Sequence, residues 1–237
     1  PGGLYGQGAR GLSLAEVKQI VADFTKAAQR AAKNGWDGVE LHAAHGYLLC
    51  QFLDPAFNQR TDEYGGSLEN RARLLCECIT EIRRYLPAPF ILGVRISPEA
   101  YADGQLLTLA DMLHLSDILG NLEVDYVHVS LWDFRKPSQT GGGVDMIEQF
   151  AKHKSSMGLM VAGKFEQREE LDRALGKGAD LIALGRIAIG NSDWPKRARD
   201  PEAKFAEPPY SVEFLREQSV GPAFIEYLRK RKDFVKD

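Results

Sequence analysis

Residues 34–42, NGWDGVELH, join the end of a helix to the start of a strand, and this pattern recurs along the chain. The glycine in Asn34-Gly35 favours the left-handed backbone that ends many helices. Before it, Ser13-Leu14-Ala15-Glu16 forms a capping box, and apolar residues then recur at helical spacing. After it, Gly38–His42 reads as a strand. The first predicted unit is therefore a helix followed by a strand.

The same unit recurs four more times. Further helices are predicted from Ser67 to about Leu86, from Thr108 to Leu119, from about Val144, and from Glu169 to Leu175. Alternating helices and apolar strands predict a parallel sheet covered by helices, and the weak repeat favours a (β/α)8 barrel over a doubly wound sheet. The five predicted strands are Gly38–His42, Phe90–Ser97, Tyr126–Leu131, Leu159–Phe165 and Leu181–Ile187.

The strand count divides the chain into two predicted parts. A closed barrel of this class needs eight strands, so residues 1–190 are expected to supply only strands 4–8 with their helices. Residues 191–237 are expected to form a C-terminal tail with a helix from Pro222 to Lys236. The apolar side of this helix is expected to pack on the barrel or on a partner subunit, with its basic run Arg229–Lys232 in solvent.

The composition is that of an ordinary globular protein. The 237 residues are 44% hydrophobic and 27% charged, and the net charge of -3 gives no reason to expect a nucleic-acid or membrane partner. No run of 18 apolar residues occurs. Cys50, Cys76 and Cys78 are odd in number and lack metal-site spacing, which favours a reducing, cytoplasmic setting.

Polar side chains follow the first predicted strand. His42, His45 and Tyr47 lie where that strand ends, which is where parallel barrels gather their active-site groups. Two imidazoles and a phenol suit the binding of a carbonyl oxygen and the delivery of a proton. Alternatively, the histidines cap local backbone and Tyr47 is half-buried packing. A two-histidine metal site is a further alternative, but it lacks an evident third ligand.

An arginine lies within the second predicted strand. Arg95 is surrounded by apolar residues, where an unpaired cation is costly to bury. A cofactor that becomes anionic on reduction would offset this cost. A structural ion pair with a buried carboxylate such as Glu40 would offset it equally well, and the spacing does not choose between them.

The last two predicted strands each end in a glycine followed by a cation. These pairs are Gly163-Lys164 and Gly185-Arg186. Loops after the last two strands of such barrels often bind phosphate, because glycine lets backbone amides approach and the cations offset the charge. The alternative is two glycines used for turns, with solvated cations beside them.

Two longer runs carry a family resemblance. Residues 38–48, GVELHAAHGYL, with 51–55, QFLDP, resemble the old yellow enzyme family, and so does the long run 58–71, NQRTDEYGGSLENR. Residues 93–97, GVRIS, and 184–186, LGR, follow in the family's order. The resemblance covers about Leu12 to Pro195. It implies an FMN-binding (β/α)8 barrel in which NADH or NADPH reduces the flavin and the flavin passes hydride to an activated alkene.

The resemblance also implies roles for individual residues. His42 and His45 would hold the substrate's electron-withdrawing oxygen, and Tyr47 would donate the proton; some family members have Asn at the place of His45. Arg95 would lie against the pyrimidine edge of the flavin. Phenolic ligands are expected to bind over the flavin. The residues expected to hold the FMN phosphate are Gly163, Lys164, Gly185 and Arg186.

The chain departs from the family pattern in three places. The early strands, one of which carries a glutamine used by the FMN site, would precede Pro1, so this chain is expected to be an N-terminally incomplete form lacking about 110 residues. No cysteine follows Cys78, so the four-cysteine iron–sulfur segment of larger relatives is not expected. Residues 130–133, SLWD, replace a glycine-rich form. Two alternatives remain: a flavin-free barrel isomerase or aldolase acting on a phosphorylated substrate, and a non-catalytic half-barrel assembly fragment. The macromolecular partner expected is a second copy of this chain or the missing N-terminal segment.

Overall fold

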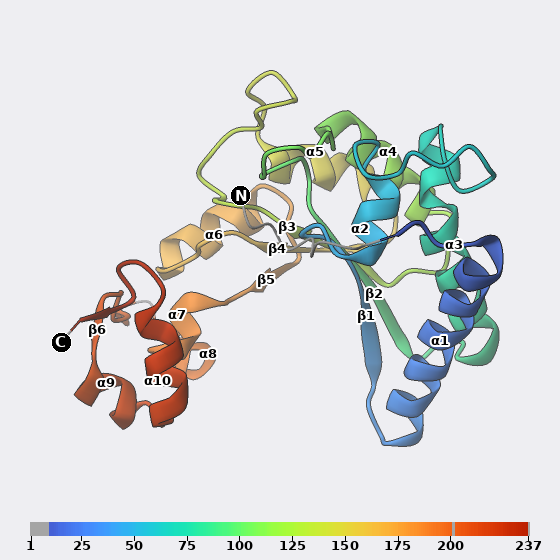
Figure 1. Cartoon of the computed structure of the whole chain (residues 1–237). Helices are drawn as coiled ribbons and strands as arrows, with labels where there is room; N and C mark the ends of the chain where they lie inside the picture. The colour runs from blue at the N-terminus through green and yellow to red at the C-terminus, as the bar shows by residue number, and fades with distance from the viewer. Residues whose placement is uncertain (1–9, 201, 237) are drawn as a thin grey trace.

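Five parallel strands form one sheet in chain order in the computed structural model, which describes residues 10–200 and 202–236 (Figure 1). The strands are β1 (Gly38–Ala43), β2 (Ile91–Ile96), β3 (Tyr126–Ser130), β4 (Gly158–Ala162) and β5 (Leu181–Ala183). One long helix precedes each strand: α1 (Leu14–Lys33), α3 (Leu68–Tyr85), α4 (Leu109–Leu119), α5 (Met146–His153) and α6 (Arg168–Gly176). The predicted repeat of helix and strand is confirmed.

The helix starts lie at the caps that the sequence predicts. The Ser13 hydroxyl accepts the amide of Glu16 at 3.3 Å, and the Glu16 carboxylate accepts the amide of Ser13 at 2.8 Å. Ser67 and Thr108 accept amides in the same way at the starts of α3 and α4. Because each hydroxyl satisfies an amide that has no partner within its own helix, local sequence is enough to fix these boundaries.

Aspartates tie the amino ends of the strands together. The Asp125 carboxylate accepts the amide of Leu92 at 2.7 Å and pairs with Arg83, and Asp180 accepts the amide of Leu159 at 2.7 Å and pairs with Lys154. Asp125 directly precedes β3 and Asp180 directly precedes β5, and each carboxylate accepts the amide of the second residue in the neighbouring strand. These contacts account for the aspartate directly before each of these two strands.

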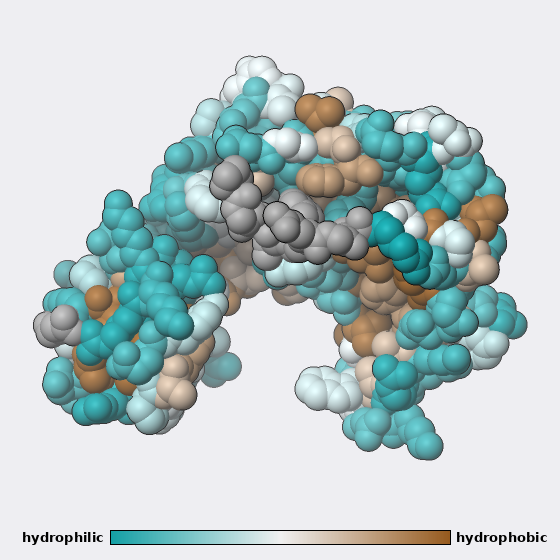
Figure 2. All heavy atoms as spheres, in the orientation of Figure 1, coloured by the Kyte–Doolittle hydropathy of each residue, from teal (hydrophilic) through white to brown (hydrophobic). Residues whose placement is uncertain are grey.

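The two faces of the sheet differ in polarity. Alternate residues such as Leu41, Val94 and Val127 are buried in one apolar core together with residues of the helices. The residues between them, on the other face, include Glu40, His42, Arg95, Tyr126, His128 and Ser130. In Figure 2 the molecule forms an arch, and in Figure 1 the strands lie along its inner side with the helices outside.

Three predicted element ends in the second half of the chain are wrong. The fourth strand ends at Ala162 and not at Phe165, because Lys164 adopts a left-handed backbone with φ of 57°. The fifth strand ends at Ala183 and not at Ile187, because Gly185 turns the chain and Arg186 begins a short helix, α7 (Arg186–Ile189). The tail helix, α10 (Pro222–Arg229), ends seven residues before Lys236. A run of like charges follows it, and Asp233 adopts a left-handed backbone with φ of 53°.

The tail contains further short elements. They are α8 (Trp194–Arg197), β6 (Tyr210–Ser211), α9 (Val212–Glu217) and β7 (Val235–Lys236), and β6 pairs with β7 in parallel. Tyr210, Leu215, Ile225, Leu228 and Phe234 form a small core of their own. A second cluster, around Trp194 and Phe205, packs against Leu171 and Leu184 of the main body. The division at residue 190 stays a prediction.

Within the described residues, no helix combines the length and the apolar character that crossing a membrane would require.

Candidate active site at the carboxyl ends of the strands

The three polar side chains predicted after β1 lie together. The turn after β1 brings the ring centroids of His42 and His45 to 5.0 Å and those of His42 and Tyr47 to 5.2 Å. His45 adopts a left-handed backbone with φ of 60°. Tyr47 is the residue before α2 (Leu48–Leu53), and it is 49% exposed. This exposure fits both a proton donor and the alternative of a half-buried packing tyrosine.

Two serines that the sequence did not single out as site residues hold this group in place. The Ser130 hydroxyl at the end of β3 lies 2.8 Å from Nε2 of His45 and accepts a hydrogen bond from Nη2 of Arg95 at 3.1 Å. The Ser97 hydroxyl accepts the backbone amide of His45 at 3.0 Å. Ser97 is the last residue of the second predicted strand, and Ser130 is next to last in the third. This position at the carboxyl ends of the strands is the one signal that could have identified them.

Glu40 does not form the ion pair with Arg95 that the sequence left open. Its carboxylate lies 2.9 Å from Nδ1 of His128 and accepts a hydrogen bond from the Tyr126 hydroxyl at 3.1 Å. Among the described residues, no carboxylate lies within ion-pair distance of Arg95, and its buried Nε has no hydrogen-bond partner. A cation whose buried Nε donor is unused calls for an acceptor at that place.

The histidines are poised as neutral groups. Partial burial, followed by the positive charge of Arg95 and the neighbouring His42, lowers the pKa of His45 to about 4. Burial and Arg95 also lower the pKa of His42, against the opposing effect of Glu40. A neutral imidazole still carries one N–H, so each histidine remains able to donate to an oxygen near pH 7.

The predicted cation after β4 already has partners. Lys164 adopts a left-handed backbone with φ of 57°. Its ammonium lies 3.8 Å from the Asp133 carboxylate and 5.3 Å from the ring centroid of Trp132. Gly163 is tightly enclosed, because a Cβ there would lie 2.9 Å from the backbone nitrogen of Phe134. The missing side chain therefore makes room for the loop after β3.

The predicted cation after β5 lies against the tail. Gly185 precedes α7 and has open space around it, and the Arg186 guanidinium lies 5.2 Å from the ring centroid of Phe234. Ala162 and Ala183 are paired in the sheet, so the two glycine–cation pairs do follow neighbouring strand ends. They do not share a partner among the described residues, and their assignment to a phosphate stays a proposal.

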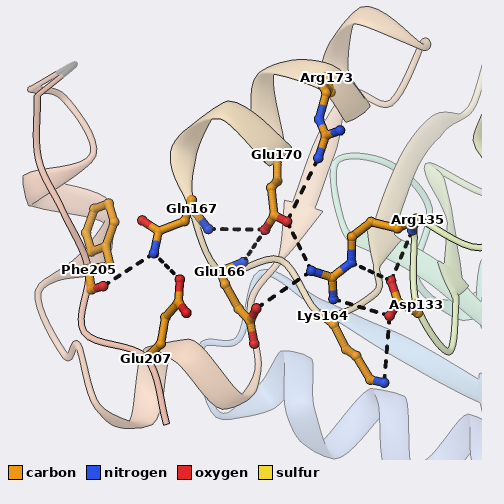
Figure 3. Close-up of polar contacts among 9 residues, drawn as sticks. All are labelled: Asp133, Arg135, Lys164, Glu166, Gln167, Glu170, Arg173, Phe205 and Glu207. Atoms are coloured by element: carbon orange, nitrogen blue, oxygen red, sulfur yellow. Dashed lines mark hydrogen bonds and ion pairs between the residues drawn. The ribbon is translucent and has the colours of Figure 1, made fainter.

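A network of charges around Arg135 reaches Lys164 through Asp133 (Figure 3). Arg135 donates from Nε to Asp133 at 2.8 Å and lies 3.3 Å from Glu170 and 3.8 Å from Glu166. Burial alone would raise the pKa of Asp133, but the hydrogen bonds from Arg135 and the charge of Lys164 hold it below its usual value. Asp133 is therefore ionised at neutral pH.

No group of three or more histidine, cysteine or acidic residues in ranges 10–200 and 202–236 is arranged to hold a metal ion. The alternative of a two-histidine metal site thus finds no third ligand in this part of the chain.

Comparison with known proteins identifies the class of enzyme to which this geometry belongs. Residues 4–204 match the model of the NADH:flavin oxidoreductase / NADH oxidase family. A probable NADH-dependent flavin oxidoreductase of Bacillus subtilis, YqiG, is 32% identical over 84% of this chain and 55% of its own length. A putative 12-oxophytodienoate reductase of Oryza sativa is 36% identical over 80% of this chain and 62% of its own.

Solved structures give the same result. Morphinone reductase in complex with tetrahydroNAD superposes with a TM-score of 0.72 at 33% identity, over 87% of this chain and 54% of the other. The old yellow enzyme homologue of Zymomonas mobilis gives 0.75 at 29% identity, over 87% and 57%. The chain belongs to the NADH:flavin oxidoreductase / NADH oxidase family. It spans a little over half the length of most of these relatives.

The comparisons confirm the main expectations at the level of the family. The resemblance to the old yellow enzymes and the partial (β/α)8 barrel are both confirmed. The family is one of oxidoreductases that use flavin and NADH, so FMN and NAD(P)H are the cofactors of the class to which the chain belongs. The roles of individual residues are not tested by these comparisons.

Proposed function

We propose that this chain carries the substrate-binding and proton-donating half of an FMN-dependent ene-reductase. FMN held beside Arg95 would supply the hydride chemistry, from NADH or NADPH to an activated alkene. His42 and His45 donate N–H groups to the activating oxygen of the alkene, such as an enone carbonyl. Tyr47 donates its hydroxyl proton to the carbon beside that carbonyl.

The observation that carries this proposal is the state of Arg95. Its Nη2 is held by Ser130, while its buried Nε has no partner in the described residues. The hydroxyl of the same serine lies 2.8 Å from Nε2 of His45. Ser130 therefore connects the cation to one of the two histidines proposed to bind oxygen. Residues at such a place fit a flavin, whose pyrimidine edge offers acceptors and becomes negative on reduction.

The histidines and the tyrosine have separate roles toward the substrate: the first bind its oxygen, and the second supplies a proton. Lowered pKa values keep both imidazoles uncharged near pH 7, and each still has an N–H group to donate to the carbonyl oxygen. Hydrogen bonds to that oxygen stabilise the negative charge that develops there as hydride arrives. The half-exposed phenol of Tyr47 beside His42 can then supply the proton to the adjacent carbon.

Anaerobic flavin titration of the purified protein tests the proposal. Added FMN should lose fluorescence as it binds, NADH should bleach the bound flavin, and cyclohexenone should restore its colour while forming the saturated ketone. Riboflavin and an alkene lacking an activating oxygen serve as controls. Bound flavin that NADH reduces but no activated alkene reoxidises would contradict the ene-reductase assignment. Absence of flavin binding would favour a flavin-free isomerase or aldolase, or an assembly role.

A further inference from the structure

The loop after β3 is built into the place proposed for the FMN phosphate. The backbone amide of Leu131 donates to the carbonyl of Ala162 at 2.8 Å, and the amide of Phe134 donates to the carbonyl of Gly163 at 3.0 Å. The phenyl rings of Phe134 and Phe165 stack with centroids 4.4 Å apart. The loop is therefore fixed against the end of β4. A charged side chain in this loop lies close enough to Lys164 to attract or repel its ammonium group.

That charge is negative and nearly enclosed. Asp133 is 8% exposed, and its carboxylate lies 3.8 Å from the ammonium of Lys164. Arg135 binds the same carboxylate through Nε at 2.8 Å, Nη2 at 3.2 Å and its backbone amide at 3.1 Å. In the sequence, Asp133 lies in the stretch that departs from the glycine-rich form of the family, so it brings a fixed anion where a neutral loop would leave the lysine free.

Other anion-binding groups nearby are also occupied. The Glu170 carboxylate accepts the amides of Glu166 at 2.8 Å and Gln167 at 3.2 Å, which are the amides at the start of α6. Glu170 also lies 3.3 Å from Arg135. Figure 3 shows these carboxylates and cations paired with one another. The region thus presents cations that are already neutralised.

We propose that Asp133 is a positioning residue that holds Lys164 in place of a phosphate and thereby weakens the preference for FMN over riboflavin. The proposal rests on the proposed function, since it takes the bound flavin to be FMN and Lys164 to lie beside its phosphate. A phosphate entering this region must displace Lys164 from Asp133 and approach a buried carboxylate. Riboflavin has no phosphate, so the cost of this exchange would fall on FMN and not on riboflavin.

Asp133→Asn tests this inference because it removes the charge and keeps the shape and an acceptor for the amide of Arg135. The expected result is FMN affinity about fivefold higher with riboflavin affinity unchanged, since one charge that repels the phosphate is removed. Asp172→Asn is the matched control, because Asp172 is an exposed aspartate on α6 whose side chain is 61% accessible. It should leave both affinities unchanged.

Two further measurements separate the role of Asp133 from the folding of the variant, and the first of them needs no flavin. Inorganic phosphate should raise the melting temperature of Asp133→Asn more than that of the parent. In the parent, Lys164→Met should weaken FMN binding less than about twofold, because the lysine is already paired. Equal gains for FMN and riboflavin in Asp133→Asn, or a loss above about tenfold in Lys164→Met, would overturn the inference. Failure of both flavins to bind would instead count against the proposed function, while the phosphate shift would still decide the role of Asp133.

Discussion

The carboxyl ends of β1–β3 and those of β4–β5 handle charge in opposite ways. At β1–β3, Arg95 keeps a buried donor without a partner and lies in a group of neutral histidines. At β4–β5, Lys164 is paired with Asp133, and Arg186 lies over Phe234. The first region keeps a hydrogen-bond donor free for a ligand, whereas the cations of the second region are already in contact with other side chains of the chain. Ligand binding is therefore expected to depend more on the first region.

The largest expected effect is on proton donation. Tyr47→Phe removes the hydroxyl beside His42, so oxidation of the reduced flavin by an enone should slow by about a hundredfold or more. Reduction of the flavin by NADH should stay near normal, because no proton donor is needed there. Stopped-flow measurement of the two half-reactions separates these steps, with Tyr85→Phe, an exposed tyrosine at the end of α3, as control. Unchanged enone turnover would remove Tyr47 from this role.

The next effect is on the flavin itself. Arg95→Met keeps most of the apolar stem but removes the charge and the unused donor. FMN and riboflavin should both bind about tenfold more weakly, as expected for a lost hydrogen bond to a charged group. Fluorescence titration measures both ligands. Arg84→Met, which changes an exposed arginine paired with Glu81, should have no effect. A variant at Arg95 that loses FMN affinity but keeps riboflavin affinity would place Arg95 at the phosphate instead.

A smaller effect is expected on stability at acid pH. The pKa of His45 is about 4 in the folded protein against 6.5 for an ordinary histidine, so the unfolded protein takes up a proton first as the pH falls. This group therefore lowers the free energy of unfolding progressively between pH 6.5 and 4 and has no effect above that window. Urea denaturation at pH 7 and pH 4.5 should show a smaller decrease for His45→Asn than for the parent. The difference is small, because the ring keeps access to solvent.

The sequence predicted whatever depends on neighbours in the chain. The capping hydroxyls of Ser13, Ser67 and Thr108 fixed three helix starts, and apolar runs located all five strands of the main sheet. The end of the fifth strand was missed because the apolar run from Leu181 to Ile189 fits a strand and a helix equally well. Only Gly185 and the packing of α7 against the tail divide it.

The site was predicted in its principal residues but not in its connections. The grouping of His42, His45 and Tyr47 follows from a strand end and a turn, which local sequence can indicate. The bridge through Ser130 joins residues separated by 85 and 35 positions, and the pairing of Glu40 with His128 spans 88. The ion pair between Lys164 and Asp133 likewise depends on how the loop after β3 packs on the end of β4. Such contacts depend on register between strands, which no single segment encodes.

Titration of the flavin-loaded protein with a phenol tests the central claim most directly, because a phenolate oxygen resembles the charged oxygen that His42 and His45 are proposed to hold. Binding should change the flavin absorption spectrum, and His45→Ala should weaken it by about 1.5–3 kcal/mol, the value of a hydrogen bond to a charged group. His114 is an exposed histidine on α4 that lies 3.7 Å from Glu69 of α3, and the His114→Ala variant should bind the phenol like the parent. A His45→Ala variant with unchanged phenol affinity would contradict the account of these strand ends as an oxygen-binding site.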